Sequence, residues 1–264
     1  MFGEKVKLYF FECGILESQK HLFTCGKGIG EPFNVPVPFF LIDHPKGKIL
    51  FDTGNALEVA RNPEEHWGDV VKAYYPRMNE GDYIINQLNR VGITPNEISY
   101  VVLSHLHLDH AGGVGQFEKA KYVVQRDELH WAYVPDFYQK PAYIKADFDR
   151  NVDWLLLEGR NDDNYDLFGD GRIIIWFTPG HTPGHQSLLV RLDISGEFLL
   201  TGDSCYTEEI LNEDILPGLV WNPSEALRSI RRIREARDAK GITVITGHDP
   251  VAWNKFRKAP EFYS

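Results

Sequence analysis

The stretch Ser104–Gly113, with the sequence SHLHLDHAGG, determines how the whole chain is interpreted. It follows a short β-rich run, so its histidines lie where a strand ends and the backbone turns. His105 and His107 alternate and therefore point to the same side of an extended segment, while Asp109 and His110 follow at the bend. Imidazole and carboxylate groups bind zinc and similar divalent metals. Four such groups within six residues exceed what one tetrahedral ion takes from so short a loop, which favours two ions.

Three later segments repeat the order of a strand, a small residue and a potential ligand. They lead to His181, Asp203 and His248. Because side chains at strand ends gather at one edge of a sheet, we expect these residues to complete the metal site. His185 and Asp52 are expected to orient ligands by hydrogen bonds instead of binding metal. For Asp52, a plain turn carboxylate is the open alternative.

Hydrophobic periodicity predicts a mixed α/β fold with two sheets in one domain, residues 1–264. Residues 55–81 lack clear periodicity and are expected to form a lid or substrate-facing insertion, or else a packed surface excursion. The predicted strands are 6–11, 38–43, 48–51, 98–103, 122–125, 173–177, 186–192, 197–201 and 242–245. The predicted helices are 82–91, one beginning at 127–131, 143–155 and 223–239.

Composition argues against several classes of function. The 264 residues carry a net charge of -10, which disfavours a nucleic-acid substrate, and no apolar run is long enough to span a membrane. Three cysteines without a CxxC pair argue against a disulfide framework and fit a reducing compartment. The amino-terminal residues lack the features of a signal peptide. We therefore expect a cytoplasmic protein that acts on a small molecule, binds neither nucleic acid nor membrane, and could form a homo-oligomer.

The order of the potential ligands resembles the metallo-β-lactamase superfamily. This resemblance implies a four-layer αββα sandwich with a dinuclear site at one edge of the two sheets. It also implies two ligand sets joined by a bridging carboxylate: His105, His107 and His181 on one metal, Asp109, His110 and His248 on the other, and Asp203 between them. Zinc is the default ion for such ligands, with iron, cobalt and manganese as alternatives.

The residues flanking the ligands narrow the resemblance. SHLHLDHAGG at 104–113, TPGHTPGHQS at 178–187 and GDSCYT at 202–207 resemble the N-acyl homoserine lactone hydrolases, or quorum-quenching lactonases. The resemblance implies that a hydroxide shared by two divalent ions opens the lactone ring. It further implies that the Tyr206 hydroxyl stabilises the oxyanion and that Asp109 relays a proton to the leaving oxygen. Leu108 stands where the family often has Phe, which makes it a candidate for the acyl-pocket wall.

An N-acyl homoserine lactone carries an apolar tail, so its pocket needs an apolar wall. Aromatic residues of the 55–81 segment and of region 131–148 are further candidates for this wall: Trp67, Tyr74, Trp131, Tyr133, Phe137 and Phe148. Each of them could equally belong to the core.

Other activities built on the same metal site are the alternatives. A glyoxalase-II-like thioesterase resembles this ligand set but carries an added carboxy-terminal region, for which few residues follow His248. Another ester or phosphotriester hydrolase would share the site. A diiron oxidoreductase of the superfamily has Glu where this chain has His107. A non-catalytic metal-binding module would not need an open dinuclear centre, so the lactonase is the expected function.

Overall fold

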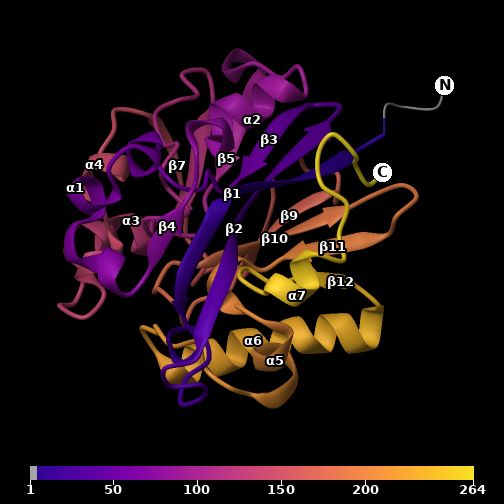
Figure 1. Cartoon of the computed structure of the whole chain (residues 1–264). Coiled ribbons are helices and arrows are strands. Elements are labelled where there is room, and N and C mark those ends of the chain that lie inside the picture. The colour runs from indigo at the N-terminus through magenta and orange to yellow at the C-terminus, as the bar shows by residue number, and fades with distance from the viewer. Residues whose placement is uncertain (1–4) are drawn as a thin grey trace.

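The computed structural model describes residues 5–264, and the strands in this range form two sheets. The first sheet, ordered β4-β1-β2-β3-β5-β6-β7, consists of β1 (Lys7–Gln19), β2 (Pro32–His44), β3 (Gly47–Phe51), β4 (Tyr75–Arg77), β5 (Ile98–Val102), β6 (Lys121–Gln125) and β7 (Asp153–Leu157). The second sheet, ordered β12-β11-β10-β9-β8, consists of β8 (Asn164–Asp166), β9 (Ile173–Phe177), β10 (Gln186–Arg191), β11 (Glu197–Leu200) and β12 (Thr243–Ile245). In Figure 1 the amino-terminal half of the chain supplies one sheet and the carboxy-terminal half supplies the other.

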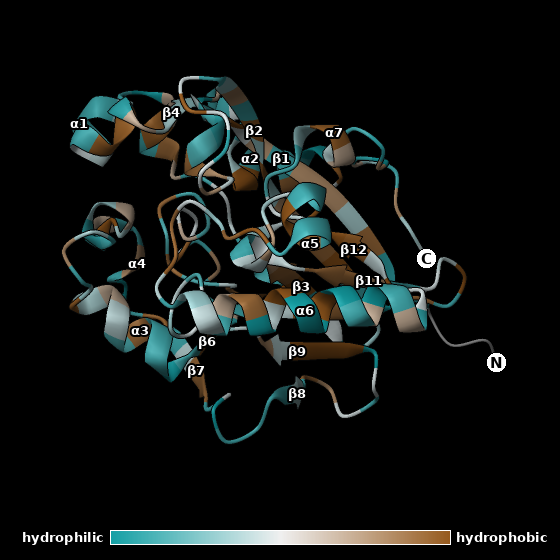
Figure 2. Cartoon of the chain, turned by 90° about the horizontal axis from the view of Figure 1, so that it is seen from below, coloured by the Kyte–Doolittle hydropathy of each residue, from teal (hydrophilic) through white to brown (hydrophobic). Residues whose placement is uncertain are grey.

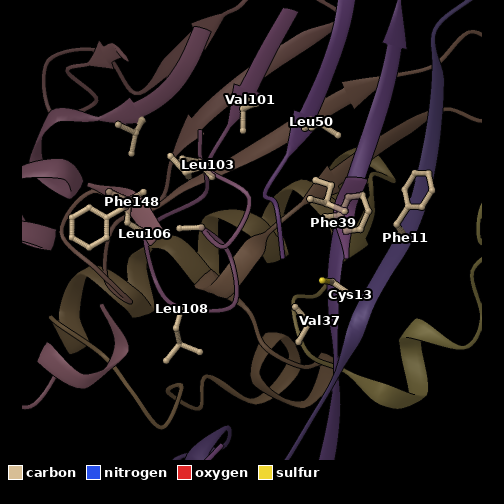
Figure 3. Close-up of a cluster of buried hydrophobic side chains, with 14 of the residues drawn as sticks. Phe11, Cys13, Val37, Phe39, Leu50, Val101, Leu103, Leu106, Leu108 and Phe148 are labelled. Carbon is tan, nitrogen blue, oxygen red and sulfur yellow. The ribbon is translucent and has the colours of Figure 1, made fainter. Parts of the chain in front are cut away.

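Both sheets have two apolar faces, which is why they stack and are also covered from outside. Neighbouring residues along a strand point to opposite faces. Phe10 of β1 therefore packs between the sheets, where its ring lies 6.3 Å from that of Phe198, while Phe11 joins the outer cluster. Leu199 and Leu200 of β11 divide in the same way. Figure 3 shows part of the outer cluster, including Phe11, Leu50 and Val101 from three strands of the first sheet.

Helices cover the outer faces of both sheets. The outer apolar cluster takes residues from α2 (Ile84–Arg90) and α3 (Arg126–Tyr133) beside the first sheet, and from α5 (Glu208–Glu213) and α6 (Pro223–Lys240) beside the second. Figure 2 shows α6 lying over the second sheet. The short helices are α1 (Pro63–Trp67), α4 (Lys145–Phe148) and α7 (Pro250–Trp253). The fold is the expected four-layer αββα sandwich.

The strands that precede the potential ligands all end at the same edge of the sandwich. β3 runs parallel to β5, β11 runs parallel to β12, and β9 and β11 are both antiparallel to β10. The loop after β5 also packs closely on the loop after β3. A Cβ atom at Gly112 would collide with the backbone of Asn55 and Ala56, so this approach requires glycine.

One predicted helix is wrong, and two predicted strands are too short. Residues 143–155 form the single turn α4 and then β7, because β7 pairs with β6 and this tertiary pairing overrides the local helical pattern. β1 and β2 extend beyond their predicted bounds, since β1 continues through a bulge between Glu12 and Ile15. Residues 55–81 form short 3-10 turns, α1 and β4, which pairs with β1. None of the helices within residues 5–264 has the length and apolarity needed to cross a bilayer.

Candidate metal centre

The loops at this edge bring together all seven residues that the sequence predicts as ligands. They form two adjacent groups in which the potential ligand atoms lie within 4.8 Å of one another. The first group consists of His105, His107, His181 and Asp203, and the second of Asp109, His110 and His248. All seven side chains are buried, although buried charged groups are costly without a partner.

The first group places three imidazole nitrogens around one point. Nε2 of His181 lies 3.2 Å from Nε2 of His105 and 3.0 Å from Nδ1 of His107. Oδ2 of Asp203 lies 3.3 Å from Nε2 of His181 and 3.6 Å from Nε2 of His105. Three nitrogens and one carboxylate oxygen are a donor set that suits a tetrahedral divalent ion.

The second group lies on the other side of Asp203. Oδ1 of Asp203 is 3.2 Å from Nε2 of both His110 and His248. Oδ2 of Asp109 is 3.5 Å from Nε2 of His248. The two oxygens of Asp203 thus face different groups, which is the arrangement of a carboxylate that bridges two cations.

Outward hydrogen bonds determine which ring nitrogen of several histidines faces the centre. The Nδ1–H of His181 donates to the Leu219 carbonyl over 2.9 Å, and that of His248 donates to the Pro36 carbonyl over 2.8 Å. With the proton on Nδ1, a neutral ring directs the lone pair of Nε2 inward. Nε2 of His110 and Oδ1 of Asp203, which face each other over 3.2 Å, are buried without a hydrogen-bond partner among the described residues. Converging lone pairs and orphaned polar atoms fit a pair of divalent cations.

The electrostatics of the two groups differ. Burial and the neighbouring imidazoles hold the pKa of His105 and His107 well below the usual value, so these rings are neutral and able to bind metal. Burial also lowers the pKa of His110, but the carboxylates of Asp203, Asp109 and Asp52 outweigh it and raise that pKa well above the usual value. The imidazole of His110 thus faces three carboxylates, whereas the rings of His105 and His107 mainly face other imidazoles.

His185 and Asp52 occupy orienting positions beside these groups. Nε2 of His185 accepts a hydrogen bond from the backbone N–H of Asp203 over 3.0 Å, and burial lowers the pKa of His185 to about 3. The carboxylate of Asp52 accepts from Nδ1 of His110 over 2.9 Å and from the backbone N–H of Ser104 over 2.6 Å. Asp52 has a φ of 58°, a left-handed conformation that is uncommon outside glycine. Its strained backbone lies at the site, where such strain is often retained.

An apolar cavity opens directly onto the two groups. Its wall includes His107, Leu108, Asp109, Asp203, Tyr206, His248, Leu16, Phe23, Val70, Tyr74, Ala142 and Leu219. The Tyr206 hydroxyl lies 3.4 Å from Nδ1 of His181, and burial raises the pKa of this phenol well above its usual value. Tyr206 therefore presents a protonated hydroxyl at the junction of the centre and the cavity.

Of the predicted wall residues, only Leu108 and Tyr74 line this cavity. Trp67 and Phe148 are buried in the outer apolar cluster, and Figure 3 shows Phe148 there together with Leu106. Trp131 donates to the Gln139 side chain. Tyr133 and Phe137 are exposed, with Phe137 at 90%. The aromatic composition of a segment does not distinguish a cavity wall from core or surface.

Several residues around the site follow no sequence pattern that would indicate them. Phe23 and Leu16 reach the cavity from the loop after β1 and from β1 itself, far from any ligand in sequence. Glu128 is completely buried beside the His105–His107 loop. An acidic residue in the first turn of a helix is ordinary, so no pattern marks Glu128.

Comparisons with known proteins agree with this geometry. A family model described as the metallo-beta-lactamase superfamily matches residues 33–248. The chain is 45% identical to the N-acyl homoserine lactonase AttM of Azorhizobium caulinodans over 98% of each protein. It is 34% identical to the N-acyl homoserine lactonase AiiA of Bacillus thuringiensis subsp. kurstaki, over 97% of this chain and 98% of AiiA.

A solved structure gives the same relationship. It is an N-acyl homoserine lactone hydrolase with the product N-hexanoyl-L-homoserine bound at its catalytic metal centre. This structure has a TM-score of 0.87 to the chain at 33% identity and covers 97% of this chain and 98% of its own. The chain therefore belongs to the metallo-beta-lactamase superfamily and, within it, to the family of the N-acyl homoserine lactonases.

Proposed function

We propose that this protein hydrolyses the lactone ring of N-acyl homoserine lactones. The observation that carries the proposal is the junction of two ligand groups, connected by Asp203, with an apolar cavity that also contains the Tyr206 hydroxyl. The ligand groups suit hydrolysis at a carbonyl, and the apolar cavity suits an acyl tail. The lactonase relatives at 34–45% identity over nearly the whole chain support the same substrate class.

Two divalent ions would be held by this chain. His105, His107 and His181 would bind one ion, Asp109, His110 and His248 would bind the other, and Asp203 would contact both. When bound, such ions supply Lewis acidity and water of lowered pKa. We propose zinc, because closely spaced imidazole and carboxylate ligands of low coordination number suit this ion. The chain's three free cysteines support a cytoplasmic location.

The protein's own groups act on the carbonyl and on the leaving oxygen. The protonated Tyr206 hydroxyl donates a hydrogen bond to the carbonyl oxygen as negative charge develops there. Asp109 lies in the cavity wall, and its carboxylate takes a proton from the attacking water and delivers it to the ring oxygen as the carbon–oxygen bond breaks. Water adds to the carbonyl carbon, and the product is an open-chain N-acyl homoserine.

The 55–81 segment forms part of the substrate-facing wall in this proposal. Val70 and Tyr74 line the cavity from this segment, together with Leu108 and Ala142 from other parts of the chain. Apolar side chains at these positions would surround the acyl tail and exclude water from it. The segment would therefore act in substrate selection as a substrate-facing insertion.

Product analysis tests the proposed function. Purified protein is incubated with N-hexanoyl homoserine lactone, and the product is identified by mass spectrometry. We expect the mass of one added water and recovery of the lactone after acidification. Release of hexanoic acid with intact homoserine lactone would mean amide cleavage and would overturn the proposal. S-lactoylglutathione is the comparison substrate, and faster turnover of this thioester would favour a glyoxalase-II-like activity instead.

A further inference from the structure

Glu128 is a completely buried acid that the proposed reaction does not use. It lies in the first turn of α3 and is not among the residues that line the cavity. Its carboxylate accepts hydrogen bonds from the Leu106 N–H over 3.0 Å, the Tyr143 hydroxyl over 2.9 Å and the Thr182 hydroxyl over 2.5 Å. A buried carboxylate with this many donors is strongly constrained in position.

The three donors belong to three segments, and each of them adjoins a potential ligand. Leu106 stands between His105 and His107 in the sequence, and Thr182 follows His181 directly. Tyr143 lies against a ligand in space, since its ring centroid is 4.5 Å from that of His107. One carboxylate thus connects both loops that supply the imidazoles of the first group.

The backbone around Glu128 is built for this close approach. A Cβ atom at Gly184 would collide with the backbone N and Cα of Glu128, so the loop that carries His181 can reach α3 only with glycine at position 184. The contact is therefore specified by two residues, a glycine on one segment and an acid on the other.

We propose that Glu128 is a positioning residue that holds the His105–His107 loop and the His181 loop at the separation needed to bind one divalent cation between them. The amide of Leu106 can only donate, so removal of the carboxylate leaves a buried N–H unpaired. Loss of the hydrogen bonds from Leu106 and Thr182 frees both loops to move apart. The inference rests on the metal centre of the proposed function.

Metal affinity and folding stability are measured on the same full-length variants to test this role. Glu128→Met keeps the volume and removes all hydrogen-bond acceptors, whereas Glu128→Gln retains an oxygen for Leu106 and an amide that can donate to the Thr182 hydroxyl. Zinc affinity is measured by competition with a chromophoric chelator, and Tm is measured on the metal-free forms. Mutation of residues that support the ligands by hydrogen bonds, without binding the metal themselves, typically changes metal affinity by about 10–100-fold.

We expect Glu128→Met to weaken binding of one of the two ions by about 10–100-fold, and Glu128→Gln to restore most of it. The cobalt-substituted Glu128→Met variant should also show an altered visible spectrum, which reports ligand geometry independently of activity. Asp147→Asn is the matched control, because Asp147 is also a buried acid but pairs with His66, away from the ligand loops. This control should bind both ions with unchanged affinity.

A lower Tm of metal-free Glu128→Met with unchanged affinity for both ions would overturn the proposal and make Glu128 a purely structural acid. If Glu128→Met fails to fold, the double variant Tyr143→Phe, Thr182→Val removes two of the three donors and keeps the carboxylate. Unchanged zinc affinity in that double variant would also overturn the proposal. A wild-type protein that binds no divalent ion would instead contradict the proposed function itself, so the two failures are distinguishable.

Discussion

The metal centre and the cavity wall are built from different kinds of chain segment. The potential ligands follow directly after strands β5, β9, β11 and β12, whose ends the sheets hold in fixed register. The wall residues outside the centre come from unrelated places, including β1, the loop after it, the 55–81 segment and the loop before α6. The centre is thus positioned by the backbone of the sandwich, and the wall by the packing of individual side chains.

This difference predicts that mutations in the two regions have different effects. A change in the centre acts on the metal ions and therefore on every substrate. A change in the wall acts on the fit of the acyl tail, so it alters substrate selection and leaves metal content unchanged. Wall residues can thus change in evolution while the metal site and its reaction are retained, as expected for a fold that hosts many functions.

The largest effect is expected from His107→Ala. This change removes a ligand nitrogen that lies 3.0 Å from Nε2 of His181. Loss of metal assistance costs several kcal/mol of transition-state stabilisation, so kcat/KM should fall by about 10³-fold or more. Elemental analysis should show less than two ions per chain in the variant and about two in the wild type. If the variant kept two ions and full activity, His107 would not be a metal ligand.

Tyr206→Phe tests the boundary between the two regions. The variant loses the hydroxyl and keeps the ring, which packs 5.3 Å from Phe23 and 5.4 Å from His248. Because the ions would share the developing charge, kcat should fall by about 10–100-fold, at or below the lower end for loss of one oxyanion donor. Metal content and Tm should not change. Unaltered kinetics with several acyl-chain lengths would show that the hydroxyl takes no part in the reaction.

Tyr74→Phe changes the wall alone. The Tyr74 hydroxyl makes no hydrogen bond to the described residues, and burial raises the pKa of the phenol. An unpartnered hydroxyl in an apolar wall is unfavourable to an apolar tail, by about 0.5–1 kcal/mol when partly solvated. KM for N-decanoyl homoserine lactone should therefore fall by about two- to fivefold, with unchanged kcat and metal content. A fall in kcat would instead indicate that Tyr74 contacts the reacting atoms.

The same contrast explains what could be predicted from the sequence. His105, His181, Asp203 and His248 each follow a recognisable strand, so one pattern suggested that they would meet at an edge. That pattern also suggested the orienting position of Asp52, which lies at the end of β3 against His110. The sandwich itself could be predicted because alternating apolar residues indicate the strands and the ligand order resembles a known family.

Apart from Leu108 and Tyr74, the wall could not be predicted, because burial of an aromatic residue depends on contacts between segments distant in sequence. Trp67 and Phe148 are aromatic residues from the regions expected to form the wall, yet their side chains are almost completely buried in the core. Phe23 reaches the cavity from a loop without periodicity. The prediction of a helix over 143–155 was wrong for the same reason, since the pairing of Trp154 with Tyr122 is a tertiary contact.

The smallest effect concerns the support of the wall. Nε2 of His66 in α1 lies 2.7 Å from Oδ1 of Asp147 in α4, and this contact ties the 55–81 segment, which supplies two wall residues, to α4. The hydrogen bond with Asp147 raises the pKa of His66. A raised pKa in the folded state gives a stabilisation that is fully present below the unfolded value of about 6.5 and is lost as the pH rises through the folded pKa.

We therefore expect the Tm difference between wild type and His66→Gln to be largest near pH 6 and to shrink toward pH 9. The His66–Asp147 pair is mostly buried, and desolvation offsets much of its attraction. A net contribution of about 1 kcal/mol corresponds to about 2–4 °C for a chain of this size. His130→Gln is the matched control, because His130 is exposed on α3 and its replacement should leave a constant, small difference across the same pH range. Both variants should retain the metal content of the wild type, since the wall and not the centre is changed. A Tm difference for His66→Gln that grows with pH would reverse the sign of the argument and show that the neutral imidazole is the stabilising form.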